Sequence, residues 1–298
     1  MKRLAVQAAL LFLWGASPAA AQGNTTDVPA RSDSVKPGPR LYRELGYGSD
    51  AYVSPATVLL NKGFDVFQLR SSTRDVWNFP YRQSFDHAVV RAFTHIGPTM
   101  KTFGGWWRLT RVELLPLGLE FEEMNWLANY TEHLIGGGLT MRMLDDWYRA
   151  HRVPFPRAMA MATTYAASAL NEMTEQPNSG PTGGGIADLV IFDVAAVLLF
   201  HWDQPTRFLV EEWRAADWSN QASFTFPNGQ LQNNGQYMTL KIPVGLGRTR
   251  FFVRGGLGAQ LGATRALDDE HSVSVAVGGE TQVSHVDATG HETIGFVP

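Results

Sequence analysis

The chain of 298 residues contains no cysteine. This absence excludes disulfide bonds, a thiol nucleophile and cysteine metal ligands. It also excludes the lipidated cysteine that a bacterial lipoprotein carries at its cleavage site. An exported protein of this size without disulfides is more typical of a bacterial envelope than of a eukaryotic secretory route.

Charge is sparse as well, because 25 basic and 28 acidic residues give a formal net charge of −3. This balance argues against a nucleic-acid partner, since phosphate binding needs clustered positive charge. The glycine runs Gly136–Gly138 and Gly183–Gly185 lack the Lys-Ser/Thr that completes a phosphate-binding loop. No Gly-x-Ser-x-Gly nucleophile motif occurs in the chain. The sequence therefore identifies no nucleotide cofactor and no standard catalytic motif.

The N-terminus has the pattern of a secretory signal. Two basic residues precede the mostly apolar stretch Leu4–Trp14, and Ala19–Ala21 supplies the small residues of a cleavage site. We therefore expect residues 1–21 to be a signal peptide that exports the protein to the periplasm or the outer membrane. Residues 22–40, rich in Pro, Ser and Thr, are expected to form a flexible linker.

The rest of the chain predicts an α+β fold. Apolar residues recur at helical spacing through residues 41–205, which predicts a helical region of about four to six helices. Residues 206–298 are the predicted β region, in which a helical or loop piece over about Thr206–Ala216 gives way to a period of two that predicts an antiparallel β-meander. The expected strands are Ser223–Phe226, Tyr237–Val244, Arg250–Leu261 and His271–Val286.

One predicted helix carries a polar face. Glu122, Asn125, Asn129 and His133 follow one another at spacings of three, four and four. Gly136–Gly138 comes next, and it either ends this helix or lets another helix approach closely. Thr140–His151 is predicted as a second helix.

The most informative feature is a set of ionisable residues in an apolar stretch. His133, Glu172, Asp188 and Asp193 all lie in segments expected to be buried, where an unpaired charge is costly. Asp188 lies just after Gly183–Gly185, so its carboxylate could cap the first turn of its helix or interact favourably with the positive end of the helix dipole. Asp193 has no such explanation and needs an internal partner, with Arg142, Arg157 and His133 as the candidates. Five residues separate the two aspartates, about 140° around an α-helix, so they need not share a site.

The order of elements over about residues 120–203 resembles uncharacterised bacterial envelope proteins that share a His, Glu and Asp pattern on apolar helices. The residues that carry the resemblance are His133, Asn171-Glu172 and Asp188, with a Pro/Gly-rich loop before the last of them. The resemblance implies an envelope location and a helix arrangement. It implies no activity.

Three interpretations of these residues remain open. The first is a buried polar network that fixes how the helices pack. The second is a metal or ligand site formed by His133, Glu172 and Asp188. The third is a catalytic acid–base set drawn from the same residues and Asp193.

The leading functional hypothesis is a non-catalytic cell-envelope protein with a buried His/Glu/Asp network and an association with the outer membrane. The alternative is a metal-assisted or acid–base hydrolase acting on an envelope lipid or glycan. Trp106-Trp107 and Trp202 are candidates for contacts with a membrane or a membrane protein, although plain packing explains them equally well.

Overall fold

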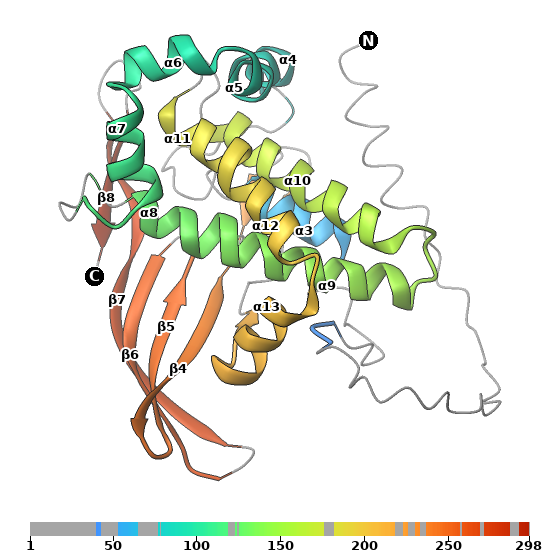
Figure 1. Cartoon of the computed structure of the whole chain (residues 1–298), viewed down its shortest axis with the longest axis vertical. Helices are drawn as coiled ribbons and strands as arrows, with labels where there is room; N and C mark the ends of the chain where they lie inside the picture. Colours follow the sequence, from blue (N-terminus) through green and yellow to red (C-terminus); the bar gives the residue numbers. More distant parts are fainter. Residues whose placement is uncertain are drawn as a thin grey trace. The chain divides into compact units, whose positions relative to one another are not determined.

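Helices come first along the chain and an antiparallel sheet follows, which confirms the predicted α+β class (Figure 1). The structure is a computed structural model that describes residues 40–42, 53–64, 77, 79–118, 123, 125–175, 182–217, 223–225, 230–232, 237–256, 258–268, 271–286 and 292–297. All of these belong to one structural unit, Pro39–Pro298. The predicted signal peptide, and the predicted linker except Arg40, lie outside the described residues.

Several of the helices join end to end into longer rods. The α-helical elements are α3 (Pro55–Gly63), α4 (Tyr81–Ser84), α5 (Arg91–Thr94), α6 (Ile96–Phe103), α7 (Trp106–Leu109), α8 (Asn125–Ala128), α9 (Gly137–Ala150), α10 (Pro156–Glu175), α11 (Gly183–Ile186), α12 (Asp193–Leu199) and α13 (Asp203–Arg207). Segments of π-helix lie within or directly after them: η2 (Phe85–Val90), η3 (Thr110–Leu114), η5 (Asn129–Gly136), η6 (Ala187–Phe192) and η7 (Phe208–Glu212). Such segments are rare, and they occur frequently at functional sites.

The glycines after His133 do not end the helix. Elements α8, η5 and α9 form one uninterrupted helix from Asn125 to Ala150. The prediction of a separate second helix over Thr140–His151 is therefore wrong. A Cβ atom on Gly138 would lie 2.2 Å from the ring of Phe200, which is almost completely buried. These glycines therefore allow a neighbouring element to approach closely, as one of the two expectations stated. Only glycine at position 138 leaves room for the Phe200 ring beside the helix.

The sheet is built mainly from successive hairpins. Its strands are β1 (Ala216–Asp217), β4 (Met238–Leu246), β5 (Thr249–Gly255), β6 (Gly258–Ala266), β7 (Ser272–Val286) and β8 (Glu292–Val297), in the order β1-β4-β5-β6-β7-β8. All neighbouring strands are antiparallel, and β2 (Ser223–Thr225) and β3 (Gln230–Gln232) form a separate pair. The predicted single strand Arg250–Leu261 is wrong. The chain turns after Gly255, where Gly256 has a φ of 155° that side chains rarely adopt.

Two apolar clusters form the core. One joins α9 and α10 to the sheet through Leu144, Phe200, Met238 and Leu240. The other packs η6 against the helices before it, with Leu109, Ile186 and Leu189 fully buried. The polar site described next lies on helices that contribute to both clusters, so its groups are held by packing on several sides.

Among the described residues, no single helix has the length and hydropathy needed to cross a bilayer. The segments Gly183–Leu199 and Asp203–Glu212, bent by 88° at their junction, meet that test only as a pair.

Candidate metal centre

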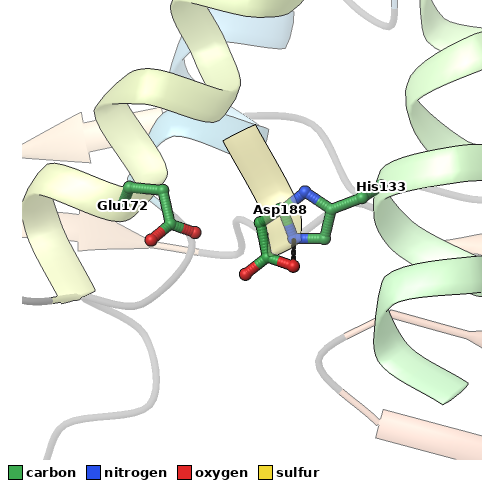
Figure 2. A group of neighbouring side chains, drawn as sticks. All are labelled: His133, Glu172 and Asp188. Atoms are coloured by element: carbon green, nitrogen blue, oxygen red, sulfur yellow. Dashed lines mark ion pairs between the residues drawn. The ribbon is translucent and has the colours of Figure 1, made fainter. Parts of the chain in front are cut away.

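Three of the four predicted site residues converge on one buried point. His133 comes from η5, Glu172 from α10 and Asp188 from η6, and their side chains approach a common centre from three helices (Figure 2). One ligand atom from each lies within 4.8 Å of the other two. Imidazole nitrogen and carboxylate oxygen are ligands of divalent zinc, iron and manganese. Ligands of one such ion lie at most about 4.4 Å apart, so small side-chain movements would close the site on a metal.

Asp193, the fourth predicted residue, orients the histidine. Its Oδ1 lies 3.2 Å from His133 Nδ1, while His133 Nε2 lies 3.8 Å from Asp188 Oδ1. Burial alone would raise the pKa of Asp193, but His133 and Lys62 together hold this pKa below its ordinary value. The ionised carboxylate can only accept a hydrogen bond, so His133 Nδ1 donates to it, and Nε2 lies on the side of Asp188. Metal-binding histidines are commonly held by a carboxylate in this way.

A π-helical turn brings the two aspartates onto one side of their helix. The backbone N–H of Asp193 donates to the carbonyl of Asp188, five residues earlier. This bond aligns residues five apart, whereas an α-helix would separate them by about 140°. Both aspartates therefore approach the ring of His133, Asp188 at Nε2 and Asp193 at Nδ1. Nothing in the sequence marks the π turn.

The site also contains residues that sequence reasoning missed. Glu113 is buried and accepts hydrogen bonds from Asn129 Nδ2 at 3.2 Å and Asn125 Nδ2 at 3.0 Å. These two asparagines and His133 belong to the polar helix face predicted from their spacing, while Glu122 lies outside the described residues. In the sequence, this polar face on a buried helix was the feature that could have indicated an acidic partner such as Glu113. Lys62, buried on α3, follows an ordinary helical pattern and gave no signal.

Negative charge exceeds positive charge at this site. Four buried carboxylates come together, those of Glu113, Glu172, Asp188 and Asp193. Burial, followed by the charges of Glu172, Glu175, Asp193 and Glu113, raises the pKa of Asp188 well above its ordinary value. Asp188 Oδ1 has no hydrogen-bond donor among the described residues. A bound cation would supply the missing partner of this buried oxygen and would offset the charge of the neighbouring carboxylates.

The other predicted charge partners lie elsewhere. Arg142 pairs with Asp203 rather than with Asp193. Arg157 pairs with Asp145 at 2.7 Å. Of the three partners expected for Asp193, the structure gives His133.

A small pocket reaches the site from the sheet side. It has a volume of about 20 Å³, room for about one water molecule. His133 and Lys62 line it together with Met238 and Gly255 of the sheet. The pocket offers a route by which an ion could reach the histidine.

Comparisons of the chain with protein-family models, curated proteins and solved structures find no match.

One prediction concerns the protein kept free of metal by a chelator. Because folding raises the pKa of Asp188, its protonated form favours the native state. Its contribution to stability is present below the ordinary pKa of 3.8 and is lost as the pH rises through the raised value. Asp193, whose pKa is lowered, acts in the opposite direction, and its contribution is lost as the pH falls below 3.8.

Urea unfolding of the metal-free protein should therefore show that the free energy of unfolding falls as the pH rises above 3.8. The Asp188→Asn variant should show a smaller decrease with pH. An identical slope in the variant would contradict the assignment. Asp268→Asn is a matched control, because Asp268 is exposed beside His271.

Proposed function

We propose that this chain is a non-catalytic protein of the bacterial cell envelope in which His133, Glu172 and Asp188 bind one divalent metal ion. The observation that carries the proposal is the convergence of these three buried side chains, with their ligand atoms within 4.8 Å of one another. A metal would neutralise part of the excess charge and link η5, α10 and η6. It would thus stabilise the packing of three helices.

A structural role is favoured over catalysis by the burial of the site. All three ligands are buried, and the adjoining pocket accommodates about one water molecule. A lipid or glycan substrate would need a far larger opening. The envelope location is supported by the sequence alone, through the signal-like pattern of residues 1–21 and the lack of cysteine.

The proposal predicts one site per chain for Zn²⁺ or Mn²⁺. Isothermal titration of tag-free protein, first stripped with a chelator, should give a stoichiometry near one. His133→Ala should weaken binding by about 100-fold or more, because it removes the only nitrogen ligand of the set. Asp188→Asn, which keeps the shape of the side chain, should weaken binding by at least about tenfold.

His271→Ala is the matched control. His271 Nδ1 lies 2.9 Å from Asp268, so this variant removes a histidine–aspartate pair at the surface rather than in the core. Its affinity should equal that of the wild type. Absence of binding to the wild type, or equal binding by His133→Ala, would contradict the proposal. Hydrolysis of an envelope lipid or glycan that depends on His133 would refute the non-catalytic part alone.

A further inference from the structure

An uncharged apolar surface covers the outer side of two adjacent helices, α10 and α12. It consists of six exposed side chains: Phe155, Met159, Val194, Leu198, Leu199 and Trp202. We call it the α10/α12 face. A helix at a water-facing surface normally presents charged and polar residues outward. This face presents none apart from Arg157 at its edge, although the same helices also carry the buried Glu172 and Asp193 of the proposed metal centre.

The two helices lie side by side (Figure 1). Arg157 Nη1 at the start of α10 donates to the carbonyl of His201 just after α12, at 2.7 Å. Further along α10, the hydroxyl of Tyr165 donates to the carbonyl of Leu189 in η6, at 3.1 Å. The helices therefore run in opposite directions, and the exposed residues at the start of α10 lie near those at the end of α12.

Few charges border this area. Arg157 is the one charged residue between Phe155 and Asn171, and it pairs with Asp145. No charged residue occurs from Val194 to Trp202, and Asp203, which follows, pairs with Arg142. Between the apolar residues of α10, the exposed positions Ala158, Ala162 and Ala166 carry only methyl groups. Such a surface is unfavourable in water and favourable against hydrocarbon.

One end of the face has the composition of a membrane interface. Phe155 is 82 % exposed and Trp202 is 58 % exposed. Arg149, Arg152 and Arg157 are close by in the chain, and Asp145 pairs with the first and third. Arg152 is exposed and adds a positive charge at this rim. Aromatic side chains with neighbouring arginines are typical of the headgroup region of a membrane. There the rings lie at the boundary with the acyl chains, and the arginines interact with anionic headgroups.

The backbone holds the aromatic tip outward at a cost. Phe155 has a φ of 54° and Arg152 a φ of 56°, a region that residues other than glycine rarely adopt. Strain of this kind persists where the surrounding structure enforces it, and it is frequent at binding sites. Here it keeps a phenylalanine ring in solvent beside a basic residue.

We propose that the α10/α12 face binds the surface of an anionic phospholipid membrane, with Phe155 and Trp202 at the headgroup level. The occupant is lipid rather than a second copy of the chain, because a basic rim meeting an identical basic rim would repel, whereas anionic headgroups complement it. The proposal deepens the envelope location proposed above and is independent of metal binding, so either can fail without the other.

Because the chain has no cysteine, single cysteines can report on this face without background. Leu198→Cys and Ala162→Cys, labelled with a polarity-sensitive fluorophore, should shift to the blue on addition of phosphatidylglycerol/phosphatidylethanolamine vesicles. Leu246→Cys is the matched control, since Leu246 is 69 % exposed on the sheet. Its label should not shift. No shift at Leu198→Cys, or an equal shift at Leu246→Cys, would overturn the proposal.

A second measurement removes the aromatic tip. Combined Phe155→Ser and Trp202→Ser should reduce the vesicle-bound fraction in flotation at least tenfold, whereas Trp107→Ser, at a residue 69 % exposed on α7, should leave it unchanged. Binding by the wild type should also fall at high salt. Equal binding to phosphatidylcholine vesicles at high and low salt would contradict the anionic requirement. A label shift that depends on protein concentration without vesicles would favour a second copy and overturn lipid as the occupant.

Discussion

Replacement of Phe200 by alanine should lower the free energy of unfolding by about 3–5 kcal/mol, the cost of emptying a buried aromatic site. The ring is 1 % exposed and lies directly against Gly138, where an added Cβ would come within 2.2–2.4 Å of three ring carbons. Helix α9 cannot move into the space, because Leu144 and Met141 fix it in the core. Urea unfolding monitored by circular dichroism measures the loss.

The reciprocal change tests the same contact from the glycine side. Gly138→Ala should destabilise the protein by about 1–3 kcal/mol through overpacking. Gly97→Ala is its control, since nothing lies within 4 Å of an added Cβ there. Phe93→Ala, at a ring 45 % exposed, is the control for Phe200 and should change stability by less than about 1 kcal/mol. A Phe200→Ala effect as small as that of Phe93→Ala would contradict the packing account.

Asp193→Asn should have an effect of similar size for an electrostatic reason. It removes the charge that faces His133 and Lys62, and leaves the buried ammonium of Lys62 without an opposing charge from Asp193. Removing one partner of a buried pair typically costs about 3–5 kcal/mol. It should also weaken metal binding by about 10–100-fold, the usual effect of losing the group that orients a ligand.

A second substitution separates the two effects. Adding Lys62→Met to Asp193→Asn removes the uncompensated charge and should restore at least half of the lost stability. Metal affinity should stay low, because His133 still lacks its carboxylate. Urea unfolding and titration calorimetry on the same samples measure both quantities. Recovery of affinity together with stability would mean that Asp193 does not orient the histidine.

Much of the fold could be predicted from the sequence, because apolar periodicity reports local structure. The helical region, the period-two strands that follow it and the polar face of Asn125, Asn129 and His133 follow from spacing alone. Helical structure continues to Glu212, past the predicted boundary at residue 205. The turn within Arg250–Leu261 was missed because its apolar alternation continues across the glycines.

The candidate site was only partly predictable. Buried acids in apolar helices identified His133, Glu172, Asp188 and Asp193, but their convergence depends on a π turn between the two aspartates. A prediction made at 100° per residue places those side chains on different sides. Glu113 and Lys62 reach the site from helices distant in the chain, and no local pattern reports such contacts.

The central claim is that His133, Glu172 and Asp188 hold a divalent metal ion. Anomalous diffraction from crystals grown with Zn²⁺, recorded on both sides of the zinc absorption edge, tests it most directly. The account predicts one buried peak about 2.0–2.2 Å from His133 Nε2 and from a carboxylate oxygen of Glu172 and of Asp188. Crystals with no peak at this point, and with the three side chains placed as in metal-free crystals, would contradict it.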